Sequence, residues 1–458
     1  MIKFGTDGWR ATIGKEFTFD NVVRVARAHA SLLKEKGIKR VLVGYDWRFM
    51  SEHFAKLVYD TFKEEGLEAR LVGSACTTPM VSFGVKYLGY ENGVMITASH
   101  NPPTYNGYKI KESFGGSATS EFVKEVEKRI NYGEVNYPKE FEPEYQEVRK
   151  HYVEKLRSLT NLDLLREREI LVVHDSMHGT TSGLLEYILR DTRVSVINIR
   201  KNRDPLFGGT PPEPIEKHVE ITKEKVRALG ADLGIVNDGD GDRIALIDEK
   251  GNYVNTQLIY VILLLHLLKH KGKRGAVVKT VSTSYLVDRI CKAFGVELIE
   301  VPVGFKNINE LILKRKDIIF GGEESGGYGV PEYLPERDGI FSALSVLEYL
   351  FLEEKSLSEV IEKIFKEFGE AYYGRIDLEV EEKAKERIKE LKEKPKEVIK
   401  NFKVRELKTI DGIKFVFEDD SWLLMRPSGT EPLVRIYAEA PSKEKVRELL
   451  EAGIELLK

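Results

Sequence analysis

The sequence predicts an α/β protein built from three related α/β domains with mixed, mostly parallel sheets, followed by a C-terminal α+β domain. The first observation is length, because 458 residues are too many for one hydrophobic core. The second is an alternation of short apolar runs with segments of helical spacing, which is typical of parallel strands and their crossover helices. The third is that each of three successive stretches ends a later strand in a polar loop. We expect the domains to span residues 1–150, 151–250, 251–368 and 369–458.

The composition is that of an ordinary globular protein, with 42% hydrophobic and 32% charged residues. A formal net charge of −3 argues against a nucleic-acid partner. The N-terminal sequence has no apolar signal core, and the longest apolar run, Leu258–Leu268, is far too short to cross a bilayer, so it predicts a buried helix. Cys76 and Cys291 match no metal or redox spacing and are expected to be buried thiols in a reducing compartment. We therefore expect a cytoplasmic protein, monomeric or homodimeric, with no membrane partner.

The first repeat ends in a serine that follows a strand. Its expected elements are a helix over Ser51–Glu65 and strands at Val41–Asp46, Ala69–Val72 and Val94–Ile96. After the last of these strands, Thr97–Pro102 consists of turn-forming residues. Ser99 is therefore expected to lie exposed just past a strand end, where α/β sheets present their chemistry. We interpret Ser99 as a phosphate-carrying nucleophile, and the alternative is an Asn-Pro turn with a capping serine.

The second repeat ends in a loop with three aspartates. Its strands are expected at Ile170–Asp175, Val194–Ile199 and Leu233–Val236, with helices near Thr181–Leu189 and Val219–Leu229. In the following loop Asp238, Asp240 and Asp242 alternate with glycines, so the backbone can aim three carboxylates at one point. Carboxylate oxygens are hard ligands that suit Mg²⁺ or Ca²⁺.

Two other interpretations of this acidic loop are open. An EF-hand would use the three aspartates together with Glu249 at its twelfth position. Against it, Arg243 stands where that loop requires glycine, and the preceding segment Leu233–Val236 is strand-like rather than helical. The other interpretation is a solvated acidic turn that binds no metal.

The third repeat ends in a glycine-rich loop, residues 321–327. Its strands are expected at Ala276–Lys279, Val296–Val301 and Ile318–Phe320, with a helix near Ser284–Phe294. Within the loop, Glu323, Glu324 and Ser325 offer acceptors and a hydroxyl on a flexible backbone, which suits hydrogen bonding to sugar hydroxyls. The alternative is a glycine-rich turn with solvated acids.

The remainder of the chain predicts strands joined by short turns and flanked by helices, which is a small α+β domain. The expected elements are a Glu/Lys-rich helix over Glu379–Lys400, interrupted at Pro395, strands at Gly412–Phe417, Ser421–Met425 and Val434–Ala438, and a helix over Lys443–Leu457. Its polar turn supplies a guanidinium, two hydroxyls and backbone N–H groups, from Arg426, Ser428, Gly429 and Thr430. Such a set can cradle a phosphate group. The alternative is a plain hairpin turn.

A serine nucleophile and a three-carboxylate loop on adjacent modules predict phosphoryl transfer. A phosphoserine carries about −2 charge, so it can lie beside the aspartates only if a divalent cation lies among them. The cation would also neutralise charge on the transferred group. Basic partners are expected nearby, and the candidates are Lys109, Arg243 and Arg10. Each of these could instead be an ordinary surface cation.

Four motifs in this order resemble the α-D-phosphohexomutase family: TASHNP (97–102), DGDGDR (238–243), GEESGG (322–327) and RPSGTEP (426–432). The segments FGTDGWR (4–10) and VGFK (303–306) are also similar to that family. The resemblance covers nearly the whole chain. It implies three related α/β domains, a fourth domain with a TATA-box-binding-protein-like fold, and one cleft shared by all four.

The resemblance also implies roles for individual residues. Ser99 would be the phosphoserine, and its phosphate would bind Mg²⁺ together with Asp238, Asp240 and Asp242. Sugar hydroxyls would be held by Glu323 and Ser325. The non-reacting phosphate would be held by Arg426, Ser428, Gly429 and Thr430. Proton transfer or charge stabilisation would fall to Arg10, His100, Lys109 and Arg243, with Lys306 as a further contact to the substrate.

One position departs from part of the family. Phosphoglucosamine mutases and some phosphomannomutases resemble GExSGH, whereas Gly327 stands here in place of that histidine. Gly327 has no side chain that could take over a role of this histidine. The Glu-Glu-Ser form is closer to phosphoglucomutases.

The expected function is reversible transfer of phosphate between C1 and C6 of a hexose, glucose or mannose or both. Phosphorylated Ser99 would form a hexose 1,6-bisphosphate, which turns around and returns its other phosphate; the same bisphosphate would prime the serine. Alternatives within the family are a phosphopentomutase or a phosphoglucosamine mutase. Alternatives of another class are a metal-dependent serine phosphatase and a non-catalytic sugar-phosphate binder.

Overall fold

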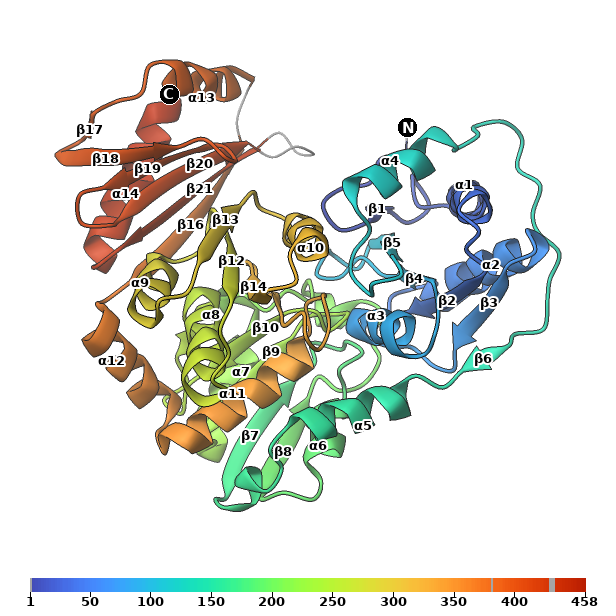
Figure 1. Cartoon of the computed structure of the whole chain (residues 1–458), viewed down its shortest axis with the longest axis horizontal. Helices are drawn as coiled ribbons and strands as arrows, with labels where there is room; N and C mark the ends of the chain where they lie inside the picture. Colours follow the sequence, from blue (N-terminus) through green and yellow to red (C-terminus); the bar gives the residue numbers. More distant parts are fainter. Residues whose placement is uncertain (1, 380–381, 428–432) are drawn as a thin grey trace.

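The computed structural model describes residues 2–379, 382–427 and 433–458, which form four β-sheets with their helices. We call these four units domains I to IV in chain order. Figure 1 shows them in an arc, with the blue N-terminal domain I and the red C-terminal domain IV at its two ends. The exact domain boundaries stay predictions.

Domain I is a six-stranded sheet in the order β1-β5-β4-β2-β3-β6. Its strands are β1 (Trp9–Thr12), β2 (Arg40–Tyr45), β3 (Glu68–Val72), β4 (Asn92–Ile96), β5 (Tyr105–Lys111) and β6 (Tyr145–Gln146). Its helices are α1 (Phe19–Glu35), α2 (Ser51–Glu64), α3 (Thr78–Tyr87) and α4 (Ser120–Lys128). Side chains alternate along β2, so Val41 and Val43 share a core with α1 and α2, whereas Leu42 packs with α3. Both faces of the sheet are thus covered, which explains the continuous apolar runs.

Domains II and III repeat this plan in shorter form. Domain II contains β7 (Ile170–Asp175), β8 (Val194–Ile199), β9 (Leu233–Asn237), β10 (Ile244–Ile247), β11 (Tyr253–Val254), α5 (Arg149–Leu159), α6 (Leu184–Leu189) and α7 (Glu220–Leu229). Domain III contains β12 (Ala276–Thr280), β13 (Leu298–Val301), β14 (Ile318–Gly322), β15 (Tyr328–Gly329), α8 (Thr256–Leu265), α9 (Tyr285–Phe294), α10 (Phe305–Lys314), α11 (Gly339–Glu353) and α12 (Leu357–Phe368).

The three sheets share one strand order, which confirms the predicted repeat. The equivalent series are β3-β2-β4-β5, β8-β7-β9-β10 and β13-β12-β14-β15. In each series the first three strands are parallel and the fourth is antiparallel to the third. The serine loop follows β4, the aspartate loop follows β9 and the glycine-rich loop follows β14. The fold therefore places these three loops at the carboxyl-terminal ends of equivalent strands.

Domain IV is an antiparallel sheet in the order β16-β21-β20-β19-β18-β17. Its elements are β16 (Tyr372–Glu379), α13 (Glu382–Glu393), β17 (Val398–Ile399), β18 (Phe402–Lys408), β19 (Ile413–Phe417), β20 (Trp422–Pro427), β21 (Leu433–Ala440) and α14 (Lys443–Leu457). The α+β prediction is confirmed. The helix expected over Glu379–Lys400 is shorter, because it ends before Pro395, and a proline cannot continue the helical hydrogen bonding.

The apolar run at the start of domain III forms a buried helix, as predicted. Every residue of α8 is buried, Asn255 caps its first turn, and a π-helical turn over His266–His270 follows it. In the described part of the chain no helix is long and apolar enough to span a membrane. Cys76 and Cys291 are free and buried, also as predicted, and burial raises the pKa of each thiol to about 12.

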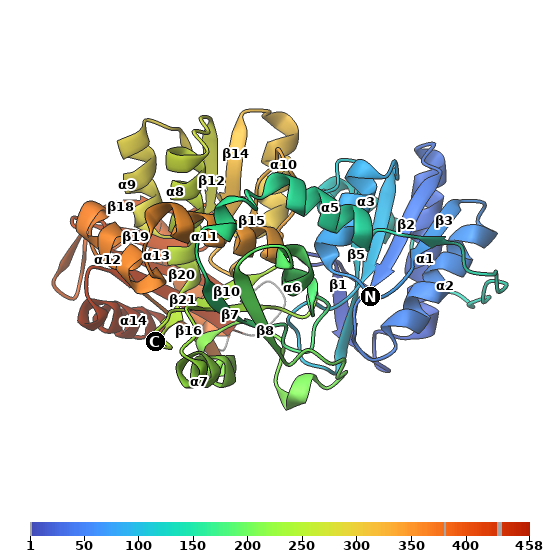
Figure 2. The same ribbon diagram turned by 90° about the horizontal axis from the view of Figure 1, so that it is seen from below.

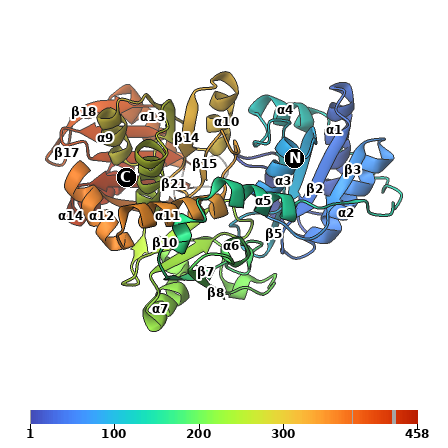
Figure 3. The same ribbon diagram turned by 60° about the horizontal axis from the view of Figure 1, so that its bottom comes forward.

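Helix α5 joins the first three domains, and Figures 2 and 3 show it running between domain I and domain II. Tyr152 and Leu156 of α5 belong to one hydrophobic cluster with Phe83 of α3 and Leu184 of α6. The Tyr152 hydroxyl also lies 2.9 Å from both carboxylate oxygens of Asp338, the N-cap of α11. Domains I, II and III therefore share a continuous core behind their loops.

Candidate active site

Ser99 lies at the meeting point of domains I and II. Its hydroxyl donates to Asp238 Oδ2 at 2.9 Å, and its Oγ lies 3.4 Å from His100 Nδ1. The prediction that Ser99 is exposed is wrong, since its side chain is completely buried. The cause is the aspartate loop of domain II, which packs so closely that a Cβ at Gly239 would lie 2.8 Å from the Ser99 carbonyl oxygen. A sequence pattern within one domain does not reveal that a second domain covers its loop.

The serine loop is held by Arg48, a residue that the sequence did not single out. Its guanidinium is buried and donates to three loop carbonyls, those of Ser99 (2.6 Å), Asn101 (2.6 Å) and Pro102 (2.9 Å), and to that of Tyr105 (3.2 Å) at the start of β5. Asp46 at the end of β2 balances its charge at 3.3 Å. Ser99 has a positive φ of 52°, which is unusual for a serine, and these bonds stabilise that backbone conformation.

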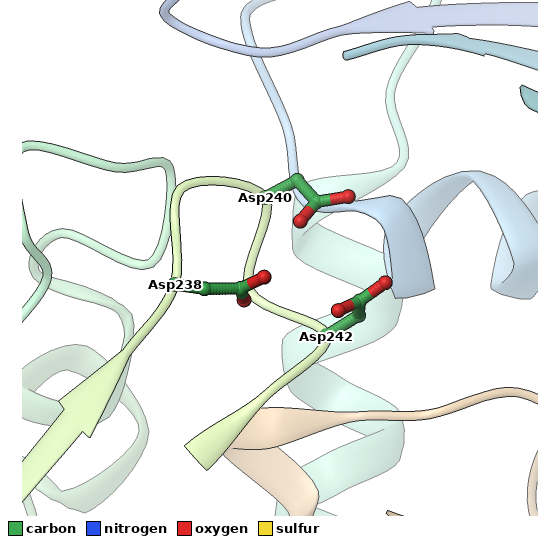
Figure 4. Close-up of side chains that lie close together, drawn as sticks. All are labelled: Asp238, Asp240 and Asp242. Atoms are coloured by element: carbon green, nitrogen blue, oxygen red, sulfur yellow. The ribbon is translucent and has the colours of Figure 1, made fainter. Parts of the chain in front are cut away.

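The three aspartates converge as predicted (Figure 4). All three are buried, and one carboxylate oxygen from each lies within 4.8 Å of the others. Asp240 Oδ2 accepts from Thr78 (2.5 Å) and Lys109 (2.8 Å), and Asp242 Oδ2 lies 3.0 Å from the same lysine. In the described structure Asp240 Oδ1 and Asp242 Oδ1 are buried without a hydrogen-bond partner.

These residues fit a divalent cation. Two unpartnered buried carboxylate oxygens are costly unless a donor or a metal ion satisfies them. Burial and its neighbours Asp242 and Asp240 raise the pKa of Asp238 well above its usual range, and a bound cation would relieve that repulsion. The EF-hand alternative is contradicted, because the loop joins two strands and Glu249 instead accepts from Ser356 at 3.0 Å.

Lys109 on β5 is a buried cation at the centre of the site. Its side chain is 1% exposed, and its ammonium contacts Asp7 (2.8 Å) as well as Asp240 and Asp242. These carboxylates raise its pKa above the usual value. The surface-cation alternative is therefore wrong for Lys109.

Two arginines complete the cationic surroundings of the serine. Arg10 on β1 donates to Asn101 at 2.9 Å and to Asp7 at 3.1 Å, so it links the N-terminal motif to the serine loop. The backbone N–H of Arg243 donates to Asp238 at 3.0 Å, and its side chain lies 3.9 Å from Asp242. Both arginine side chains are mostly buried.

His100 is a neutral imidazole beside the serine. Burial and the nearby cations Arg243, Arg10, Lys109 and Arg48 lower the pKa of His100 well below its usual value. A neutral imidazole within 3.4 Å of Ser99 Oγ can accept a proton.

The glycine-rich loop brings domain III to the same region. Glu323 accepts from the Gly304 N–H at 2.9 Å, and burial raises the pKa of its carboxyl to about 7. The buried Oγ of Ser325 has no hydrogen-bond partner in the described residues, so it is available to a ligand. Lys306 is half-buried on the first turn of α10. Glu324, by contrast, is a structural residue of the loop that accepts from Ser282 at 2.6 Å.

Among the described residues, Arg426 is the predicted residue that domain IV contributes, and its contacts lead to domain III. Arg426 pairs with Asp411 at 2.6 Å, and Asp411 also accepts from the Val303 N–H of domain III at 3.0 Å. Ser428, Gly429 and Thr430 lie outside the described residues. The structure thus joins the loops of domains I, II and III, and Arg426 borders domain III.

Several residues around the site were missed by sequence reasoning. They are buried or largely buried polar or charged groups that contact the predicted residues or one another: Asp7, Arg48, Thr78, Glu336 and Arg337. Asp7 lies within the FGTDGWR motif and could have been found there. Arg337 follows β15 in a segment without glycines or an apolar period, and its partner Asp7 lies 330 positions away.

Known protein families match each of the four domains of this chain. Family models described as phosphoglucomutase/phosphomannomutase match residues 1–136 (alpha/beta/alpha domain I), 150–251 (domain II), 255–368 (domain III) and 376–456 (C-terminal domain). A phosphoglucomutase/phosphomannomutase of Thermococcus kodakarensis is 33% identical, over 99% of this chain and 98% of its own. A probable phosphoglucosamine mutase of Pyrococcus abyssi is also 33% identical, over 99% and 97%.

Solved structures agree with this result. A Thermus thermophilus protein assigned as a phosphomannomutase superposes with a TM-score of 0.90 at 35% identity, covering 100% of this chain and 99% of its own. An Aspergillus fumigatus N-acetylphosphoglucosamine mutase, solved with GlcNAc-6P and magnesium, shares the fold at a TM-score of 0.60 and 14% identity, over 100% and 95% of the two chains. With four family models covering its length, this chain belongs to the α-D-phosphohexomutase family of enzymes, the intramolecular phosphotransferases that include phosphoglucomutases and phosphomannomutases.

Proposed function

We propose that this enzyme interconverts hexose 1-phosphates and hexose 6-phosphates, with glucose or mannose or both as the sugar. Ser99 carries the phosphate, and a hexose 1,6-bisphosphate is the intermediate and the priming activator. The observation that carries the proposal is the 2.9 Å contact between Ser99 Oγ and Asp238, inside a buried set of three carboxylates and surrounding cations. A serine held this way is suited to phosphate transfer rather than to capping a turn.

Mg²⁺ is the proposed cofactor, held by Asp238, Asp240, Asp242 and the phosphate on Ser99. When bound, it supplies positive charge that stabilises the transferring phosphoryl group. Lys109, Arg10 and Arg243 add further positive charge from the protein.

In each transfer one P–O bond breaks and another forms. The bond from phosphorus to Ser99 Oγ breaks, a bond to the sugar hydroxyl oxygen forms, the hydroxyl proton passes to a base, and the departing Ser99 Oγ takes up a proton. His100 is the proposed acceptor, because its imidazole is neutral and lies beside the serine. The reverse transfer returns the other phosphate of the bisphosphate to Ser99.

The sugar and its non-reacting phosphate occupy the side of domains III and IV. We assign Glu323 and Ser325 to the sugar hydroxyls, because one is a buried carboxylate and the other has a hydroxyl without a partner among the described residues. Lys306 lies at the start of the adjacent helix. Arg426, together with Ser428, Gly429 and Thr430, is assigned to the phosphate. Closure of domain IV over the ligand would exclude water, which competes for the phosphoserine.

The choice of sugar is tested with a substrate panel. Glucose, mannose, glucosamine and ribose 1-phosphates are each supplied with Mg²⁺ and a trace of glucose 1,6-bisphosphate, and kcat/KM is measured. We expect glucose 1-phosphate or mannose 1-phosphate to be used best. Preference for glucosamine 1-phosphate would favour the phosphoglucosamine mutase alternative. The similarity to the probable phosphoglucosamine mutase of Pyrococcus abyssi supports that alternative. Preference for ribose 1-phosphate would favour a phosphopentomutase.

A further inference from the structure

Arg337 lies where three domains meet. Its side chain is 3% exposed, and its Nη2 lies 2.7 Å from Asp7 of domain I and 2.8 Å from Asp242 of domain II. Its Nη1 lies 3.7 Å from Glu323, the carboxylate assigned to the sugar. Its Nε lies 3.3 Å from the neighbouring Glu336. One guanidinium therefore connects the aspartate loop, Asp7 (which also contacts Lys109) and the glycine-rich loop.

The side chain of Arg337 also explains why position 327 is a glycine. A Cβ on Gly327 would lie 2.3 Å from Arg337 Cδ and 2.9 Å from Cγ. Gly327 is not among the glycines with a positive φ, so its backbone conformation is one that any residue can adopt. The space beside position 327 is filled by the stem of the arginine, and this is the position at which part of the family resembles GExSGH.

The geometry points to Arg337 as a positioning residue for phosphoryl transfer. Its guanidinium holds the aspartate loop and the Asp7–Lys109 pair in a fixed position relative to Glu323 of the glycine-rich loop. Its side-chain stem requires glycine at position 327. The kinetic part of this inference rests on the proposed function. Asp242 Oδ2 is shared by Arg337 and Lys109, so loss of the arginine leaves that buried oxygen with Lys109 alone. A lysine could reach one of these carboxylates but lacks the planar fork that contacts several at once.

The kinetic test compares Arg337→Met and Arg337→Lys with Lys86→Met. Lys86 makes another contact between domains I and III, donating to the Pro331 and Tyr333 carbonyls at 3.1 and 2.7 Å, away from the serine. We expect Arg337→Met to lower kcat about 100-fold with KM changed less than about threefold, and Arg337→Lys to recover part of the loss. Lys86→Met should keep kcat within about twofold. Wild-type kcat in Arg337→Met, or an equal loss in Lys86→Met, would overturn the inference.

The second test needs no substrate. Gly327→Ala is made in the wild type and in Arg337→Ala, and the Tm of all four proteins is measured. We expect the alanine at 327 to lower Tm in the wild type and to lower it much less when the arginine stem is gone. Equal decreases in both backgrounds would overturn the coupling. This result is independent of the sugar, so a wild type inactive on every sugar phosphate would refute the proposed function and leave the coupling intact.

Discussion

Ser99 Oγ and Asp238 Oδ2 lie 2.9 Å apart, although 139 positions separate the two residues in the sequence. One follows β4 of domain I and the other follows β9 of domain II. The contact places a hydroxyl at the edge of a buried three-carboxylate set, and the predictions below depend on this placement.

Ser99→Ala should remove both the covalent phosphate and the mutase activity. Intact-mass spectrometry of the wild type, incubated with glucose 1,6-bisphosphate, should show one added phosphate that the variant lacks. Since the Ser99 hydroxyl is the group that contacts Asp238 at the aspartate set, kcat should fall by more than about 10³-fold. Ser182→Ala, at a serine that donates to the Lys201 carbonyl outside the site, is the control and should keep the phosphate. Phosphate retained by the alanine variant at position 99 would refute the nucleophile.

Asp240→Asn should lower kcat far more than it raises the KM for sugar phosphate. The reason is that a metal ion at these carboxylates acts chiefly on the transition state. Titration of Mg²⁺ by calorimetry should show weaker binding in the variant, and EDTA should abolish wild-type turnover. Glu249→Gln is a matched control, because Glu249 would bind metal only in an EF-hand, and here it accepts from Ser356. Equal losses in kcat and affinity would count against the metal assignment.

Arg48→Met should destabilise the protein by about 3–5 kcal/mol, because it leaves Asp46 buried without its cation and removes the donor to four backbone carbonyls in and next to the serine loop. Urea denaturation measures the free energy of unfolding. The variant should also lose the phosphate on Ser99 to water faster than the wild type, since the loop is no longer held. Arg203→Met, at an arginine that is 42% exposed and pairs with Glu52, should cost less than about 1 kcal/mol. A loss no larger than this control would show that the loop does not depend on Arg48.

Asp338 should make stability depend on pH. Burial raises the pKa of this carboxyl to about 6, above its ordinary value of 3.8, so the folded state binds the proton more tightly than the unfolded state. Its stabilising contribution is complete below about pH 4 and is lost as pH rises to 6. Asp338→Asn, which can still cap α11, should remove this dependence, worth up to about 3 kcal/mol.

The measurement is urea unfolding of wild type and Asp338→Asn at pH 4, 5, 6 and 7. The free energy of unfolding of the variant, relative to wild type, should increase from pH 4 to 6 and then level off. A constant difference across this range would contradict the raised pKa. Tyr152 and Tyr333 also contact this carboxylate, and both stay protonated over the range because burial raises their pKa values.

Much of the fold and of the site could be predicted from local patterns. Central strands such as β4 and β9 are buried on both faces, so their apolar runs are visible in the sequence, and the polar loops that follow them stand out. The strand β16 was missed, because its partly exposed residues lack an apolar run.

The residues that hold the loops together could not be predicted. Arg48 and Arg337 are buried charges whose partners come from distant segments, and a single arginine in a sequence is otherwise typical of the surface. The burial of Ser99 depends in the same way on the aspartate loop of another domain. Such contacts follow from domain packing, which leaves no local period or motif.

The most direct test of the central claim follows phosphorus by ³¹P NMR. Wild type and Ser99→Ala are each mixed with glucose 1-phosphate, Mg²⁺ and a trace of glucose 1,6-bisphosphate, and sugar phosphates and free phosphate are recorded together. We predict that the wild type forms glucose 6-phosphate with almost no free phosphate, and that the variant forms neither. Free phosphate without isomer would indicate a phosphatase, and isomer formed by Ser99→Ala would contradict the serine carrier.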